Sequence, residues 1–274
     1  MVATSREPAA DVSRKRQGPT APPLTARPRG DRVPLSFAQE RLWFLDQLGL
    51  SRSAYNEASA LQLDGKLDVA ALERSFEELI RRHEVLRTRF ESVDGEPFQV
   101  IDASADLRME VVDLTSCTPE EREEWLDRLM RDEIERPFDL IRGPLLRARL
   151  FRLDDERHVL LGTTHHIVSD GWSFGVLKSE IGALYAAFSQ NRPSPLQPLA
   201  VQYADYALWQ KAWLQGDILE RQLAYWRERL SGAPAALTLP ADRPRPAVPS
   251  FKGAMVPVAL SKELSTALPD LARR

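Results

Sequence analysis

The sequence contains little cysteine, little histidine and no long apolar run. Its single cysteine, Cys117, excludes an internal disulfide and any zinc site built from several thiolates. No apolar stretch approaches the roughly 20 residues that a transmembrane helix requires, and the N-terminus lacks the apolar block of a signal peptide. We therefore predict a protein without a membrane partner and with a cytoplasmic location.

The sequence also has no large excess of positive or of negative charge. The 37 basic and 40 acidic side chains give a formal net charge of −3, whereas a nucleic-acid-binding domain usually carries an excess of positive charge on one face. The composition therefore argues against nucleic acid as a partner. With 274 residues, of which 43% are hydrophobic, the chain is long enough for one large domain or two modest ones with a true core.

Three regions differ in composition. Residues 1–30 are rich in arginine and proline and have almost no apolar periodicity, which predicts a disordered basic tail. Residues 31–192 alternate predicted strands and helices. A proline-rich stretch, Asn191–Pro198, interrupts regular structure and marks a lobe boundary, so that residues 193–274 form the start of a second lobe, which we expect to be incomplete.

Local signals define the expected helices and strands. Ser36 and Gln39 have the spacing of a capping box, Asp68 can cap a helix, and Asp94-Gly95 predicts a hairpin. Strands are expected at Glu57–Leu63, Leu86–Glu91, Pro97–Ile101, Met109–Val112, Leu145–Leu153, His158–Thr164 and Gly253–Leu260, and helices at Arg41–Leu48, Val69–Arg82, Pro119–Glu135, Trp172–Gln190, Tyr203–Leu214, Ile218–Leu230 and from Lys262. This order predicts an α/β fold, an α+β sandwich whose mixed or antiparallel sheet is covered by helices.

The most informative stretch runs from His165 to Gly171, with the sequence His-His-Ile-Val-Ser-Asp-Gly. The chain has only four histidines, so an adjacent pair followed by Asp and Gly at these offsets is improbable by chance. The stretch lies between a predicted strand and a predicted helix, where catalytic groups are commonly held. A lone histidine at a strand end is more often structural, but the whole pattern favours a catalytic site.

A metal site is the first alternative. Two imidazoles and a carboxylate are suitable ligands for zinc or non-haem iron. Adjacent residues on a strand, however, point to opposite faces, so His165 and His166 do not easily converge on one ion. We predict no metal.

Four segments, in one order, resemble the condensation domains of nonribosomal peptide synthetases. They are Leu35–Leu45, Arg82–Phe90, His165–Ser173 and Tyr203–Gln210. The resemblance covers roughly residues 31–274 and implies a chloramphenicol-acetyltransferase-like fold of two lobes with a tunnel between them. It also implies a reaction, in which an upstream aminoacyl or peptidyl thioester is joined to the amine of a downstream aminoacyl thioester. Because the second lobe is expected to be truncated, we expect the chain alone to be inactive.

The same resemblance assigns the two histidines. It implies that His166 faces the tunnel as the catalytic residue and that His165 packs the other way. An imidazole can accept a proton from the attacking amine or donate a hydrogen bond to the oxyanion that forms during attack. The sequence leaves both roles open.

Supporting roles follow from the resemblance for the rest of the motif. Asp170 is expected to hold the loop through an ion pair, with Arg87 as its partner. Gly171 allows the backbone to pass close to substrate or to adopt a conformation barred to other residues, and Trp172 and Ser173 shape the wall of the site.

The implied partners are upstream and downstream peptidyl carrier proteins, together with an adjoining adenylation domain or the missing second lobe. No cofactor of the chain itself is implied, because the phosphopantetheine arm arrives on the carrier proteins. Three alternatives stay open: an ester-forming acyltransferase of the same superfamily, a noncatalytic fragment that binds carrier proteins, and, much less favoured, a glycerolipid acyltransferase suggested by the spacing from His165 to Asp170. The sequence Asp170–Ser173 favours condensation over epimerisation.

Overall fold

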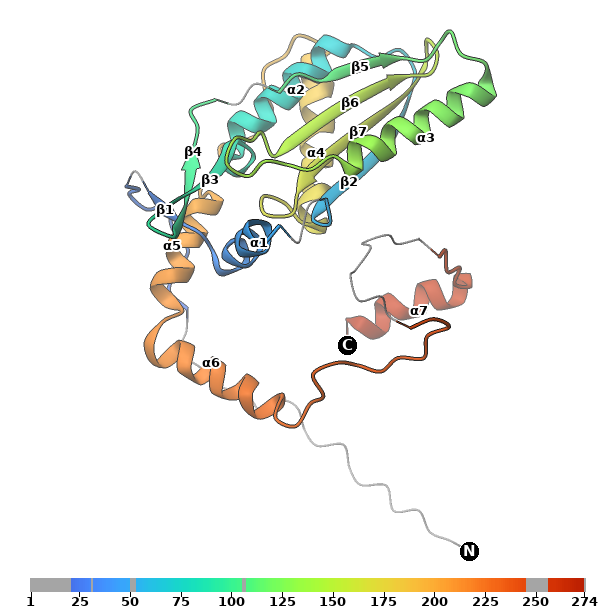
Figure 1. The fold of residues 1–274 in the computed structure, drawn as a ribbon. Coiled ribbons are helices and arrows are strands. Elements are labelled where there is room, and N and C mark those ends of the chain that lie inside the picture. Colours follow the sequence, from blue (N-terminus) through green and yellow to red (C-terminus); the bar gives the residue numbers. More distant parts are fainter. Residues whose placement is uncertain (1–20, 31, 50–52, 105–106, 245–255, 274) are drawn as a thin grey trace, which may run out of the picture. The chain divides into compact units, whose positions relative to one another are not determined.

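The computed structural model describes residues 21–30, 32–49, 53–104, 107–244 and 256–273 (Figure 1). The chain divides into two compact units, Met1–Ser231 and Gly232–Arg274. The first unit contains a four-stranded sheet in the order β2-β7-β6-β5 and a three-stranded sheet in the order β1-β4-β3. This arrangement of mixed and antiparallel sheets with helices confirms the predicted fold class.

The larger sheet brings the start of one strand beside the end of another. Its strands are β2 (Asn56–Asp64), β5 (Glu110–Asp113), β6 (Leu146–Arg152) and β7 (Arg157–His165). β7 pairs antiparallel with both β2 and β6, whereas β5 and β6 are parallel. The register sets Asn56 opposite His165 and Glu57 opposite Thr164. The first residues of β2 therefore lie next to the histidine motif.

The smaller sheet is built on a tight hairpin. β3 (Thr88–Val93) and β4 (Glu96–Ile101) are joined by Asp94 and Gly95, whose φ angles of 53° and 84° are both in the left-handed region that such two-residue turns require. β3 begins later than predicted because residues Glu84–Arg87 form a short 3-10 helix, η1. The two-residue strand β1 (Val33–Pro34), which pairs with β4, was not predicted.

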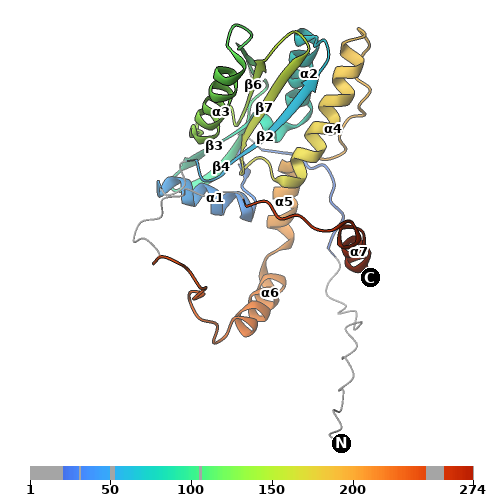
Figure 2. The ribbon, with the colours of Figure 1, turned by 90° about the vertical axis from the view of Figure 1, so that its right-hand side faces the viewer.

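Helices cover both faces of the larger sheet. The described helices of the first unit are α1 (Phe37–Gln47), α2 (Val69–Arg82), α3 (Pro119–Glu135), α4 (Gly171–Phe188), α5 (Tyr203–Trp213) and α6 (Gly216–Arg229). Figure 2 shows α3 on one side of the sheet and α2 and α4 on the other. Ser36 and Gln39 form the predicted capping box of α1, and the Asp68 side chain caps α2.

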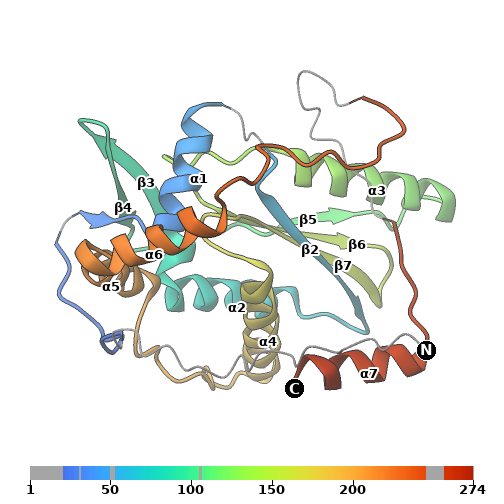
Figure 3. The same ribbon diagram turned by 90° about the horizontal axis from the view of Figure 1, so that it is seen from below.

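Two apolar clusters support the histidine motif. One fills the space between α2, α4 and the sheet, where Leu79, Leu150 and Leu184 have no exposed surface. The other joins Trp43 of α1 to Val168 of the motif and also contains Leu35, Phe90, Phe138, Leu140, Leu145 and Ile167. Each such side chain contributes about 1.5–3 kcal/mol on burial. Figure 3 shows α1 between the β3–β4 hairpin and the larger sheet.

The segment before β1 is fixed to the first unit. Residues 21–30 have no regular secondary structure, but Arg29 forms ion pairs with Asp205 at 2.9 Å and with Glu84, and the Trp209 indole donates a hydrogen bond to the Pro22 carbonyl. Contacts with the folded unit therefore begin before Asp31, the predicted start of order. The rest of the predicted disordered tail lies outside the described residues.

Contacts of α5 show to which unit this helix belongs. Because α5 provides Asp205, and the Tyr203 hydroxyl lies 2.9 Å from the Ser36 hydroxyl, α5 belongs to the first unit. The division into compact units falls at residue 231, and the lobe boundary at 192 stays a prediction.

In the second unit, the helix expected from Lys262 is present as α7 (Lys262–Ala272). The strand expected at Gly253–Leu260 is wrong for its described part, since residues 256–260 have no regular structure and Val256 and Val258 are about four-fifths exposed. An alternating apolar pattern forms a strand only where a partner strand and a packing surface exist. Across the residues that the structure describes, no helix has the length and apolarity needed to span a lipid bilayer.

Candidate functional site

A turn fixed by backbone hydrogen bonds connects β7 to α4. His165 is the last residue of β7, and α4 begins at Gly171. The His166 amide donates to the Tyr55 carbonyl at 2.8 Å, and the Val168 amide donates to the His165 carbonyl at 3.0 Å. The backbone of the motif is therefore fixed by one hydrogen bond to Tyr55 and by one within the turn.

His165 belongs to the interior. It is 1% exposed, and its ring centroid lies 6.3 Å from that of Tyr55 and 6.2 Å from that of Phe138. Burial, with a smaller contribution from neighbouring His166, lowers the pKa of His165 to about 4. Its Nδ1 accepts the Ile167 amide at 3.1 Å, so the neutral ring carries its proton on Nε2.

His166 has a different environment. Its side chain is 36% exposed, and Nδ1 lies 2.9 Å from Oε1 of Glu57. Nδ1 makes no hydrogen bond of good angle in this structure, so this contact is electrostatic. The ring is nearly parallel to Tyr55, at 6° and a centroid distance of 6.4 Å. Among the described residues nothing hydrogen-bonds to Nε2, which, unlike Nδ1, is not buried.

Glu57 is held by a second set of contacts. Its Oε2 accepts a hydrogen bond from the Ser169 hydroxyl at 3.0 Å, and that hydroxyl lies 2.6 Å from the Thr164 hydroxyl. Thr164 is fully buried and Ser169 is 7% exposed. The carboxylate is therefore fixed between a buried hydroxyl pair and the His166 ring. Glu57 was not among the predicted site residues, because only the β2–β7 register brings it here.

Asp170 caps α4. Its Oδ1 accepts from the Ser173 amide at 2.8 Å and from the Ser173 hydroxyl at 2.6 Å. These bonds, the hydroxyl bond first, lower the pKa of Asp170. The carboxylate thus satisfies two donors at the start of the helix, where a negative charge is favoured.

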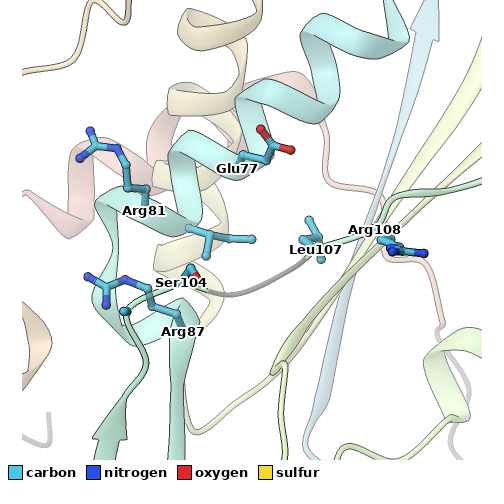
Figure 4. A pocket seen from close by; sticks show the side chains of 8 residues that line it. Glu77, Arg81, Arg87, Ser104, Leu107 and Arg108 are labelled. Carbon is cyan, nitrogen blue, oxygen red and sulfur yellow. The ribbon is translucent and has the colours of Figure 1, made fainter.

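Arg87 does not reach Asp170. Its guanidinium donates to the Asp102 carbonyl and lies 3.7 Å from Glu84. Figure 4 shows it in a separate polar pocket of about 440 Å³, with Arg81 and Arg108. The predicted ion pair between Asp170 and Arg87 is therefore wrong for this structure, because each side chain has its own local partners.

The remaining predicted residues lie at the start of α4. Trp172 is 85% exposed and, with Gly175 and Val176, lines a shallow groove on the helix. Gly171 has no left-handed φ, and a Cβ there would meet no atom within 4 Å. The backbone therefore does not require glycine at this position, which corrects the conformational part of that prediction.

The geometry is suited to proton transfer. An imidazole with a carboxylate at one nitrogen and an open second nitrogen is the arrangement by which histidine acts as a general base in many enzymes. In the part of the chain that the structure describes, no three His, Cys, Asp or Glu side chains gather as a metal site would require. What the fold brings together at this turn is one imidazole, that of His166, and one carboxylate, that of Glu57.

Comparison with known proteins shows the family to which the chain belongs. The sequence model of the Condensation domain family matches residues 30–274. A linear gramicidin synthase protein from Brevibacillus parabrevis is 48% identical over 246 residues, which are 90% of this chain and 3% of that protein.

Solved structures are similar as well. The X-domain in a complex of the X-domain and OxyB from teicoplanin biosynthesis has a TM-score of 0.75 and 36% identity, over 84% of this chain and 50% of that one. The starter condensation domain of rhizomide synthetase has the same fold, with a TM-score of 0.67 at 21% identity, over 75% of this chain and 49% of that one. The chain thus spans about half the length of these solved chains.

Proposed function

Since the chain belongs to the Condensation domain family, we propose that it takes part in amide-bond formation between two carrier-bound substrates during nonribosomal peptide synthesis. The donor is an aminoacyl or peptidyl thioester, and the acceptor is the free amine of an aminoacyl thioester. The observation that supports this most directly is the half-exposed His166 ring, with Nε2 open and Glu57 at Nδ1.

The proposed step balances without any further reactant. The acceptor amine attacks the donor carbonyl, a C–N bond forms and the C–S bond of the donor thioester breaks. Nε2 of His166 takes a proton from the attacking amine, and the departing sulfur leaves as a thiol after it receives a proton. The products are a peptide lengthened by one residue on the acceptor carrier and a free thiol on the donor carrier.

Positioning and proton transfer divide the catalytic work. Holding two tethered reactants end to end lowers the barrier by roughly 7–11 kcal/mol. A placed general base adds about 10²–10⁴-fold. The contribution proposed for this chain is the base on its rigid turn, together with one wall of the space in which the reactants meet.

The partners follow from this chemistry. Upstream and downstream peptidyl carrier proteins deliver the substrates on their phosphopantetheine arms, so the chain needs no cofactor of its own. An adenylation domain loads each carrier. Because the chain spans about half of the solved relatives, we assign the rest of the substrate tunnel to sequence corresponding to their other half.

A protein-binding module is the second candidate. It is favoured by the 36% identical X-domain, whose structure is that of a complex with another protein. A module of that kind needs a folded surface but no proton acceptor. The open Nε2 of a ring whose Nδ1 lies beside the Ser169-bonded Glu57 carboxylate favours catalysis.

The test compares turnover with binding. The native polypeptide that contains this chain is incubated with a donor and an acceptor carrier protein, each loaded in turn with every proteinogenic amino acid, and the dipeptidyl product is measured by mass spectrometry. We expect product with the amine acceptor, and less with the matching hydroxy-acid acceptor if the enzyme forms amides. Carrier binding without product under any loading would overturn the catalytic proposal and favour the binding module.

A further inference from the structure

We propose that Glu57 is a positioning residue that keeps the His166 proton on Nδ1, so that Nε2 acts as a proton acceptor and not as a donor to the oxyanion. This inference rests on the function proposed above and deepens it, because it names the residue that sets the tautomer on which the proton-acceptor role of His166 depends. The juxtaposition that supports it is the 2.9 Å separation of Glu57 Oε1 and His166 Nδ1.

The chemistry of the two groups sets the direction. An ionised carboxylate can only accept hydrogen bonds, whereas each nitrogen of a neutral imidazole is either a donor or an acceptor. A carboxylate 2.9 Å from Nδ1 therefore favours the tautomer with its proton on that nitrogen. The lone pair is then on Nε2, the nitrogen that is not buried and has no partner among the described residues.

The carboxylate is held where this effect requires it. Ser169 donates to its second oxygen, and Ser169 is itself buried beside Thr164. A positioning group works only if its own orientation is fixed by packing and hydrogen bonds. The Nδ1 contact is not yet aligned as a hydrogen bond, and catalytic hydrogen bonds commonly tighten only when substrate is bound.

The other acid of the motif does not compete for this role. Asp170 is committed to the Ser173 amide and hydroxyl. His165 contributes no second acceptor toward His166, since its Nδ1 accepts from Ile167 and its Nε2 carries the proton. Glu57 is therefore the carboxylate that faces the Nδ1 side of the ring.

The first experiment reads the tautomer and needs no substrate. The protein is labelled with ¹⁵N-histidine, and the ring nitrogens are observed by NMR at pH 8. With four histidines in the chain, the His166 signals are assigned by their loss in His166→Ala. We expect a protonated Nδ1 and an unprotonated Nε2 in the native protein, and a shift toward a protonated Nε2 in Glu57→Ala.

Steady-state kinetics supply the second measurement. Glu57→Ala should lower kcat by at least about tenfold, while KM for the carrier proteins stays within about twofold, because the carboxylate acts on the base and not on substrate binding. Glu57→Gln should recover much of kcat, since its amide oxygen can still accept from Nδ1. Glu110→Ala is the matched control, because it removes an ion-paired glutamate from another strand of the same sheet, 2.9 Å from Arg149.

The two measurements separate the two proposals. An unchanged His166 tautomer in Glu57→Ala would overturn the role of Glu57 whatever the activity. An altered tautomer with unchanged kcat would overturn the assignment of Nε2 as the acceptor. If instead His166→Ala retains full activity, the proposed use of His166 in catalysis fails, while the NMR result still decides whether Glu57 sets the tautomer.

Discussion

His165 and His166 are neighbours in the chain but belong to two different regions of the molecule. His165 lies in an apolar interior beside Tyr55 and Phe138, and burial keeps it neutral. His166 is partly exposed and lies against the Glu57 carboxylate, which Ser169 holds from beneath the surface. The difference shows how one strand end can serve stability with one residue and chemistry with the next, since successive positions face opposite sides.

The largest expected effect is on the rate of product formation, and it comes from removing the His166 ring. His166→Ala should lower the rate of dipeptidyl product formation by at least about tenfold, and by up to about 10⁴-fold if proton transfer limits the reaction. Its unfolding free energy should change by no more than about 1 kcal/mol, because the ring is partly exposed and lies outside the apolar clusters. Product formation is followed by mass spectrometry and unfolding by urea titration. A full rate in this variant would mean that positioning of the tethered substrates accounts for nearly all of the catalysis.

The interior side should respond in the opposite way. His165→Ala removes a buried ring and the acceptor of the Ile167 amide, so it should lower the unfolding free energy by about 2–4 kcal/mol. The measurement is the same urea titration. If His165→Ala proved as stable as the native protein while losing activity, the division between a structural and a chemical histidine would be wrong.

A pH series sharpens the comparison without removing either ring. The unfolded chain binds a proton at His165 below about pH 6.5, whereas the folded chain binds it only near pH 4. Stability from this residue is therefore complete above pH 6.5 and declines as the pH falls toward 4. From pH 8 to pH 5 the loss is about 2 kcal/mol.

The control for the pH series is His165→Asn, whose amide oxygen can still accept from Ile167 but does not titrate. The difference between the native protein and this variant isolates the histidine contribution from the other acids of the chain. Equal pH slopes for the two proteins would show that His165 titrates normally.

The helix cap below the motif should give a smaller effect. Asp170→Ala removes the acceptor of the Ser173 amide and hydroxyl, which should destabilise the protein by about 1 kcal/mol. Asp170→Asn retains an oxygen at the cap and should lose less. Thermal unfolding of the three proteins tests this order, and an unchanged midpoint for Asp170→Ala would refute the capping role.

Local signals were sufficient for much of the fold. The Ser36 capping box, the Asp68 cap and the Asp94-Gly95 turn are each determined by residues within a few positions of one another, and all three are present. The predicted strand ending at Leu260 failed because its alternation has no partner strand among the described residues of that unit. A local pattern does not contain that information.

The candidate site likewise has a part that local sequence signals predicted and a part that they did not. The sequence identified the turn that carries His166, because both flanking elements have strong patterns. It did not identify Glu57, which precedes His166 by more than a hundred residues and reaches it only through the β2–β7 register. It also paired Asp170 with Arg87 by resemblance, although each has closer partners. Pairings across long sequence separations depend on tertiary packing, and one sequence does not specify them.

The smallest expected effect tests that last pairing. If Asp170 and Arg87 act independently, the double variant Asp170→Ala/Arg87→Ala should lose stability equal to the sum of the two single losses, with a coupling energy below about 0.5 kcal/mol. An ion pair in the folded protein would give a larger coupling, because removing either partner would already abolish the interaction. The matched positive control is the cycle for Arg29 and Asp205, which are 2.9 Å apart. Since Asp205 is 1% exposed, that cycle should show coupling well above the Asp170–Arg87 value, and a reversed order of the two couplings would restore the pairing inferred from the family.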